Sequence, residues 1–218
     1  MSETYVEFRT PPDVRGYLHS PPNPNGDLLV LAHGAGSNAQ ASLLLTIANE
    51  FAGAGFVVLR CDLPYRQARP YGPPGPGDAA RDRQGLKNAV AAVRPWAGRR
   101  IFLGGDSYGG RQSTMLCAEE PDLVRGLLLF SYPLHPPRKP EQLRTQHLPG
   151  LNTASIFVEG TRDPFGSIEE MERSIGYSHA TIRSQLSQIA GSVPILCCAW
   201  WRPDGTDLLS DPSPTSPA

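Results

Sequence analysis

Short apolar runs alternate with amphipathic helical patterns along the chain, and this alternation restricts the possible fold most strongly. Continuous apolar runs are typical of strands that are buried on both faces of a sheet. Strands alternating with helices indicate an α/β domain with a mostly parallel central sheet and helices on both faces. We expect strands at Tyr5–Arg9, Gly16–His19, Leu28–Ala32, Phe56–Arg60, Ile101–Gly104, Gly126–Tyr132, Ser155–Glu159 and Val193–Trp201.

Helical spacing of apolar residues predicts the segments between these strands. We expect helices at about Leu43–Phe51, Tyr108–Ala118 and Ile168–Ile175. A further helix is expected to follow Asp78, which could cap it. Two stretches, 63–77 and 133–151, are rich in proline, glycine and basic residues, and we expect both to be irregular.

Length and charge limit the class of protein. The chain has 218 residues, with 20 basic and 21 acidic side chains and a formal net charge of −1. This length suits one domain, which we expect at 1–209, followed by a disordered tail at 210–218 that is rich in proline and serine. The charge balance argues against nucleic acid or an anionic membrane as the main partner, because both require a basic excess.

The N-terminus is polar and lacks the apolar segment of a secretory signal, and the apolar runs are too short to span a bilayer. We therefore expect a cytoplasmic protein. The cysteines are Cys61, Cys117, Cys197 and Cys198, and their spacing fits neither a disulfide framework nor a metal-binding pair. Buried free thiols are the expected state, with no metal and no cofactor.

Residues 105–109, G-D-S-Y-G, match the pattern G-x-S-x-G between an expected strand and an expected helix. In that setting, Ser107 lies on a tight turn with its hydroxyl exposed above the sheet edge, as a nucleophile must be. Glycines on both sides permit a strained turn that passes close to the neighbouring backbone. The alternative is an ordinary glycine-rich turn.

A second motif, H-G-A-G at residues 33–36, ends the expected strand Leu28–Ala32. A loop of this kind supplies one N–H group of an oxyanion hole, and the residue after the nucleophile supplies the other. We expect the backbone amides of Ala35 and Tyr108 to form this pair. His33 is then expected to hold the loop by hydrogen bonds rather than to act as a base.

The same stretch permits a different interpretation. Residues 34–39, G-A-G-S-N-A, follow a strand and precede a helix, and Asp62 ends the next strand. That order resembles a dinucleotide-binding fingerprint and implies an oxidoreductase. His33 before the first glycine and the long spacing to Asp62 weaken this interpretation, which also leaves Ser107 unexplained.

Four motifs together resemble small α/β-hydrolases related to dienelactone hydrolase: L-A-H-G-A-G at 31–36, G-G-D-S-Y-G-G-R at 104–111, Y-P-L-H-P-P at 132–137 and E-G-T-R-D-P-F-G at 159–166. More closely, they are similar to those of bacterial relatives of the hydrolase-like domain in the nonspecific-lethal complex subunit and in a testis-expressed protein. The resemblance covers residues 16–175. It implies an α/β-hydrolase fold, Ser107 as nucleophile and Asp163 as the triad acid.

Asp163 also fits this role from its position. It follows the expected strand Ser155–Glu159, and a serine followed by an acid is the chain order of α/β-hydrolases. Pro164 and Gly166 favour a turn that directs the carboxylate inward. The Asp-Pro pair is also a common turn initiator, and Asp62 and Asp106 are weaker alternatives for the acid.

The triad histidine is missing from its expected place after the last strand. Only His179 follows Asp163, and it precedes the expected strand Val193–Trp201. Similar hydrolases carry G-H-D-L where this chain has Gly205 and Thr206, and a threonine hydroxyl is not a useful base at neutral pH. Residues 176–209 are therefore atypical, through either divergence or a change of reading frame.

His135 is a possible substitute for the base, although the resemblance places it in a pocket wall, and His19 is expected to be a strand residue. The predicted function is a serine hydrolase acting on small-molecule carboxylic esters. The alternative from another class is a catalytically impaired hydrolase-like binding protein without a triad histidine. Arg66 and Arg69 are expected to be solvated at the surface, and Arg111 is a candidate for contact with an anionic substrate.

Overall fold

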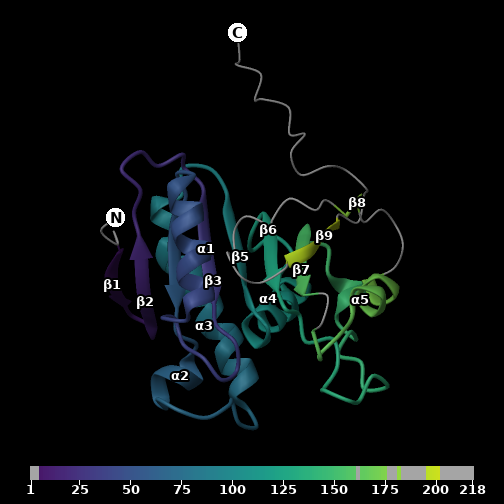
Figure 1. The fold of residues 1–218 in the computed structure, drawn as a ribbon. Helices are drawn as coiled ribbons and strands as arrows, with labels where there is room; N and C mark the ends of the chain where they lie inside the picture. The colour runs from purple at the N-terminus through teal and green to yellow at the C-terminus, as the bar shows by residue number, and fades with distance from the viewer. Residues whose placement is uncertain (1–4, 161–162, 176–180, 183–194, 202–218) are drawn as a thin grey trace.

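The computed structural model describes residues 5–160, 163–175, 181–182 and 195–201 (Figure 1). Their strands form a single sheet in the order β1-β2-β4-β3-β5-β6-β7-β9-β8. The central strands from β4 to β7 run parallel, whereas β1, β2, β8 and β9 pair antiparallel at the two edges. This is the mostly parallel sheet that the sequence predicts.

The strands are short, as expected from the apolar runs. They are β1 Tyr5–Thr10, β2 Val14–His19, β3 Leu28–Ala32, β4 Val57–Cys61, β5 Ile101–Asp106, β6 Gly126–Phe130, β7 Ser155–Gly160, β8 Thr181–Ile182 and β9 Ile195–Trp201. The helices are α1 Ser42–Gly53, α2 Pro64–Ala68, α3 Asp78–Val93, α4 Tyr108–Glu119 and α5 Ile168–Ile175, with 3₁₀ turns at Arg94–Trp96 and Leu148–Gly150.

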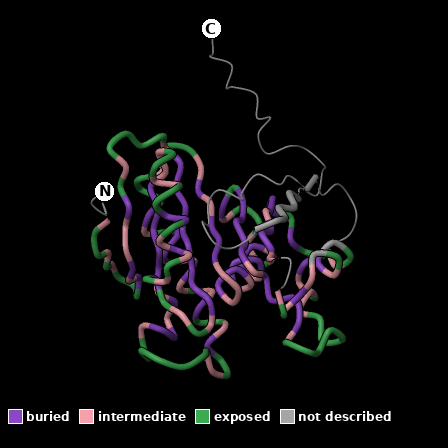
Figure 2. The backbone as a smooth tube through the Cα atoms, in the orientation of Figure 1, coloured by how far each residue is buried: buried purple, intermediate pink, exposed green. Residues whose placement is uncertain are grey.

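Helices cover both faces of the sheet, and the central strands are buried between them (Figure 2). On β3, Leu29 and Leu31 pack in one apolar cluster with Leu44 and Ile47 of α1. Alternate residues of the same strand pack in a second cluster with α3 and α4; they include Leu28, Val30 and Ala32. This two-sided burial explains why the strand is a continuous apolar run.

The expected elements are confirmed with boundaries that shift by one or two residues, apart from the stretch 63–77. The prediction there was wrong, because Pro64–Ala68 form α2 and its Tyr65 and Arg66 are buried. So short a helix carries no apolar periodicity, and Pro64 at its first turn was interpreted as a loop signal. Asp78 does not cap α3: Gly77 holds that position, and Asp78 begins the helix.

Candidate active site

Ser107 occupies a strained turn between β5 and α4, at the carboxyl end of the parallel sheet. Its backbone has φ 48° and ψ −109°, a conformation that residues other than glycine rarely adopt. The Ser107 N–H donates to the Phe130 carbonyl oxygen at 2.8 Å, and its own carbonyl accepts from the Arg111 N–H at 2.9 Å. The turn is thus bonded to the end of β6 on one side and to the first turn of α4 on the other.

The glycines of the motif permit close backbone approach, as the sequence predicts. A Cβ atom at Gly105 would collide with the Ala32 carbonyl oxygen of β3. A Cβ atom at Gly109 would lie 2.7 Å from the His33 carbonyl oxygen, again a backbone atom that cannot rotate away. The turn around Ser107 therefore fits tightly against the end of β3 and the loop that follows it.

The loop 33–36 passes directly beside Ser107. A Cβ atom at Gly34 would lie 3.6 Å from Ser107 Cβ, in van der Waals contact, and 2.7 Å from Asp106 Oδ2, so a side chain there would displace the Asp106 carboxylate. Among the described residues, neither the Ala35 N–H nor the Tyr108 N–H has a hydrogen-bond acceptor. The structure thus brings together the two segments from which an oxyanion hole is expected, each with an amide that is not already used.

His33 is fully buried, and both of its ring nitrogens have hydrogen-bond partners. Its Nδ1 lies 2.8 Å from the Gly34 carbonyl oxygen, and its Nε2 accepts from the Leu63 N–H at 3.2 Å. Burial lowers the pKa of His33, which favours the neutral ring that these two bonds require. His33 is engaged in holding its own loop, as its sequence position led us to expect.

Two residues of α2 hold the same loop from outside. The Tyr65 hydroxyl donates to the Ala35 carbonyl oxygen at 2.8 Å, and the Arg66 Nε donates to the Ser37 carbonyl oxygen at 2.6 Å. Arg66 is only 4% exposed, so the expectation of a solvated surface residue was wrong for it. Arg69 is about half exposed in its side chain and pairs with Asp78. The error followed from missing α2, which carries Arg66 inward.

Asp163 lies in the turn after β7. Its Oδ1 accepts from the Phe165 N–H at 2.8 Å, and its N–H donates to the Gly160 carbonyl oxygen at 3.1 Å. The turn that Pro164 and Gly166 favour is therefore present. Asp163 also acts on Asp106, the last residue of β5. Burial and the nearby Asp163 together raise the pKa of Asp106 to about 6.

Glu159, at the end of β7, is a third carboxyl group in this region and was not singled out from the sequence. It is 3% exposed; its Oε1 accepts from the Tyr132 N–H at 2.7 Å, and its buried Oε2 has no partner among the described residues. Burial, with Asp163 and Asp106 nearby, raises the pKa of Glu159 to about 9. A glutamate inside an apolar strand run, next to an expected acid, was the available signal.

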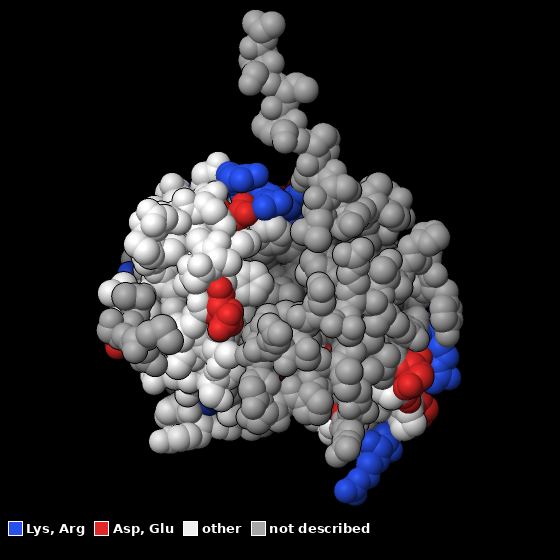
Figure 3. Space-filling view, turned by 45° about the horizontal axis from the view of Figure 1, so that its top comes forward, with Lys and Arg blue, Asp and Glu red and all other residues white. Residues whose placement is uncertain are grey.

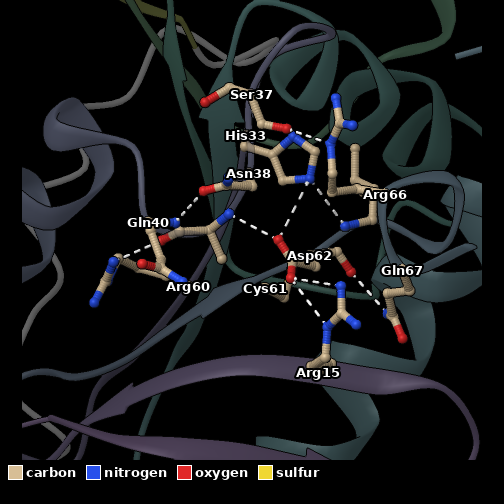
Figure 4. A network of polar contacts seen from close by, with 12 residues as sticks. Arg15, His33, Ser37, Asn38, Gln40, Arg60, Cys61, Asp62, Arg66 and Gln67 are labelled. Carbon is tan, nitrogen blue, oxygen red and sulfur yellow. Dashed lines mark hydrogen bonds and ion pairs between the residues drawn. The ribbon is translucent and has the colours of Figure 1, made fainter. Parts of the chain in front are cut away.

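Asp62, the other alternative for the acid, is engaged elsewhere. Its Oδ2 pairs with Arg15 Nη2 at 3.0 Å, and its Oδ1 accepts from the Ala39 N–H at 2.8 Å (Figure 4). These bonds fix the end of β4 to β2 and to the loop that precedes α1. The same bonds occupy the carboxylate that the dinucleotide interpretation requires for a ribose.

The described histidines all have partners other than Ser107. His19, in β2 as expected, accepts from Arg60 Nε at 2.8 Å. His135 lies 2.8 Å from the Pro136 carbonyl oxygen through Nδ1 and 3.4 Å from Glu170 Oε2 through Nε2. His147 Nε2 lies 2.8 Å from Thr114 Oγ1. His179 lies outside the described residues, and so do Thr206 and the tail 210–218.

Cys61 and Cys117 are buried free thiols, as predicted. Within the described ranges, no group of three or more histidine, cysteine or acidic residues is arranged to hold a metal ion. No helix in those ranges is long and apolar enough to cross a membrane. On the face shown in Figure 3, the described basic and acidic side chains lie in a few small groups; one acidic group stands alone, and the others contain both signs.

The family of alpha/beta hydrolase domains matches residues 25–188, which include β3, the Ser107 turn and the turn at Asp163. The chain belongs to this family. The match confirms the resemblance found in the motifs as far as the α/β-hydrolase family. It gives no support to the dinucleotide-binding interpretation of residues 34–39.

Solved structures of α/β hydrolases share the fold at low sequence identity. An alpha-beta serine hydrolase homologue from Coxiella burnetii has a TM-score of 0.59 at 16% identity, over 90% of this chain and 86% of that one. Dienelactone hydrolase from Anabaena variabilis has a TM-score of 0.59 at 19% identity, over 78% and 80%. An esterase from Pyrococcus furiosus has a TM-score of 0.60 at 16% identity, over 78% and 74%.

Proposed function

We propose that this α/β hydrolase cleaves small carboxylic esters by acyl transfer to Ser107 and then to water. The observation that carries the proposal is the turn at Ser107: a serine at φ 48°, at the N-terminus of α4, against a loop whose Ala35 amide has no acceptor among the residues that the structure describes. A strained backbone at a strand end is typical of a residue held for function.

The arrangement supports each part of the acylation step. The Ser107 hydroxyl oxygen attacks the ester carbonyl carbon, and the proton of the hydroxyl goes to a base. The negative charge on the carbonyl oxygen is stabilised by the N–H groups of Ala35 and Tyr108, with the N-terminal end of α4 adding to this field. The alcohol leaves with the proton, and water then releases the carboxylic acid by the same route.

Asp163 is the acid of this proposal and His179 is the base. Asp163 fits because it follows β7, and within the described part of the chain its carboxylate accepts one hydrogen bond, from the Phe165 N–H to Oδ1, which leaves Oδ2 for the imidazole. A carboxylate in this position orients the imidazole and stabilises it when it becomes charged. His179 is assigned by chain order, because each of the four described histidines is bonded elsewhere. No cofactor enters the reaction, and the substrate is a small carboxylic ester.

A second function is favoured by one specific observation. Because none of the described histidine rings contacts Ser107, a catalytically impaired hydrolase-like protein that binds a small ligand at the same place is the alternative. Such a protein keeps the turn and the amides without an efficient base. Removal of a triad member lowers the rate by about 10⁴-fold or more and leaves slow turnover, so the magnitude of the rate decides between the two functions.

The test is hydrolysis of p-nitrophenyl acetate, butyrate and octanoate by the full chain, with Ser107→Ala as the control. The proposal predicts turnover that saturates with substrate, prefers the shorter acyl groups and disappears in Ser107→Ala. A rate no higher than that of Ser107→Ala, from protein that unfolds cooperatively, would contradict the hydrolase and favour the impaired binding protein. Replacing His179 by alanine should remove the activity as well.

A further inference from the structure

Asp82 of α3 is fully buried, yet it belongs to none of the motifs around Ser107. Both of its carboxylate oxygens are used. Oδ1 accepts from the Tyr65 N–H at 3.0 Å, and Oδ2 accepts from the Tyr108 hydroxyl at 2.8 Å. Burying a carboxylate is costly unless its oxygens are bonded, so these two contacts explain how Asp82 is accommodated.

The first contact leads to the loop 33–36. Asp82 Oδ1 fixes the backbone of Tyr65 at the start of α2, and the Tyr65 hydroxyl bonds to the carbonyl oxygens of Ala35 at 2.8 Å and Gly34 at 3.2 Å. The carbonyl of Gly34 belongs to the peptide group that carries the Ala35 N–H. A shift of Tyr65 therefore turns the amide that the proposed oxyanion hole takes from this loop.

The second contact leads to the turn after the nucleophile. The Tyr108 hydroxyl donates to Asp82 Oδ2, and Tyr108 is the residue whose backbone N–H forms the other half of the proposed hole. The Tyr65 and Tyr108 rings also pack edge to face, with centroids 5.9 Å apart. Burial raises the pKa of both tyrosines, so each hydroxyl stays a donor.

We propose that Asp82 is a positioning residue that sets the separation and orientation of the Ala35 and Tyr108 amides by holding Tyr65 and Tyr108 on one carboxylate. The inference rests on the proposed function, because it concerns the hole in which the oxyanion forms. It assigns to α3 a role in catalysis although Asp82 touches neither the nucleophile nor the substrate.

The experiment compares an ester with the matching thionoester, in which sulfur replaces the carbonyl oxygen. Sulfur is a larger and weaker hydrogen-bond acceptor, so the hole favours the ester, and the ratio of the two rates reports the geometry of the hole. In Asp82→Ala, we expect kcat for the ester to fall about 10- to 100-fold with little change in KM, which is below the loss from deleting a donor outright. The rate for the thionoester should fall much less.

Asp78→Ala is the matched control. Asp78 lies one turn earlier on the same helix and is also buried and bonded, to Arg69, Arg81 and the Gly75 N–H, away from the hole. It should lower stability without changing the ester-to-thionoester ratio. Tyr65→Phe and Tyr108→Phe each remove one oxygen, and each should reduce the ratio even if Asp82→Ala fails to fold. An unchanged ratio in these variants overturns the proposal.

A second readout does not depend on turnover. The amide resonances of Ala35 and Tyr108 in ¹⁵N-labelled protein should both move in Tyr108→Phe, because this change frees Asp82 Oδ2 and lets the shared carboxylate shift. Tyr65→Phe keeps the bond from the Tyr65 N–H to Asp82 and should move mainly the Ala35 resonance. Movement of the Tyr108 resonance alone in Tyr108→Phe would contradict a common anchor. If the wild type cleaves no ester, the proposed function fails, and these resonances still decide whether Asp82 couples the two segments.

Discussion

Ser107 and Ser131 directly follow the neighbouring parallel strands β5 and β6, and their φ angles are nearly equal, at 48° and 47°. Each N–H donates to a carbonyl oxygen in the next strand of the sheet, from Ser107 to Phe130 at 2.8 Å and from Ser131 to Val158 at 2.9 Å. Judged by strain and by this bond alone, the two serines are equivalent.

The residue after each serine separates them. Tyr108 begins α4, and its N–H has no acceptor among the described residues. Tyr132 begins a loop, and its N–H is bonded to Glu159 Oε1 at 2.7 Å. A strained serine is therefore insufficient for a nucleophile site; the following amide must also be left unused and directed to where negative charge develops.

Alanine at each serine tests this difference most strongly. Ser107→Ala should lower ester hydrolysis by about 10⁴-fold or more, because the attacking oxygen is lost. Ser131→Ala should change the rate by less than about twofold, a difference of under 0.5 kcal/mol. Steady-state kinetics with p-nitrophenyl acetate measure both. Comparable losses in the two variants would remove the distinction drawn between the turns.

Glu159 bonds to the residue after Ser131, and its raised pKa predicts that the stability of the protein depends on pH. Its pKa is raised to about 9 when folded, so between its unfolded value near 4.3 and pH 9 the folded state holds a proton that the unfolded state has lost. Stability from this group is complete at low pH and decreases as the pH rises, by at most about 1.4 kcal/mol per pH unit. Glu159→Gln keeps the acceptor for Tyr132 and removes this dependence.

Urea unfolding at pH 5 and pH 8 checks this prediction. Glu159→Gln should gain stability relative to the wild type as the pH rises. A constant difference between the two proteins at both pH values would show that Glu159 ionises normally in the fold.

A substitution at Gly109 tests how tightly the turn at Ser107 fits against the loop that follows β3. Gly109→Ala places a Cβ 2.7 Å from the His33 carbonyl oxygen, and we expect a loss of about 1–3 kcal/mol with reduced activity. Gly150→Ala is the control, because a Cβ there meets nothing within 4 Å. Thermal unfolding of both variants measures the difference. If Gly109→Ala were as stable as Gly150→Ala, the backbone around Ser107 would shift to admit the methyl group at little cost in free energy.

Asp106 before the first serine is expected to show the smallest effect. Burial and Asp163 raise its pKa to about 6, so its charged form is disfavoured in the fold, and this penalty is complete above pH 6. Asp106→Asn should therefore stabilise the protein by about 1 kcal/mol at pH 7.5 and have little effect near pH 3.5. Asp62→Asn should have the opposite sign at pH 7.5, because it weakens the pair with Arg15. If Asp106→Asn destabilised the protein at pH 7.5, the charged form of Asp106 would not be disfavoured in the fold.

The central sheet and the turn at Ser107 were predictable because each depends on local sequence. Leu28–Ala32 is apolar at every position because both faces of β3 are buried, and Gly105 and Gly109 mark the close contact with that strand. His33 was recognised as structural from its place at the strand end, and its two ring bonds agree with that.

The contacts made by α2 and α3 were not predictable, because they depend on which distant segments meet. Arg66 and Asp82 are charged residues in polar stretches, and only the folded chain shows that both are buried, Arg66 against the loop after β3 and Asp82 against Tyr108. Glu159 was missed for a similar reason: its partner, the Tyr132 N–H, comes from a different strand end.

Intact-mass analysis of the wild type, Ser107→Ala and Ser131→Ala after brief exposure to a fluorophosphonate shows directly whether Ser107 is an activated nucleophile. The reagent loses fluoride and forms a phosphorus–oxygen bond with an activated serine, and peptide mapping then locates the adduct. We predict one adduct per chain within minutes in the wild type and in Ser131→Ala, on Ser107, and none in Ser107→Ala. An unlabelled wild type that is correctly folded, or an adduct on Ser131, would contradict the account.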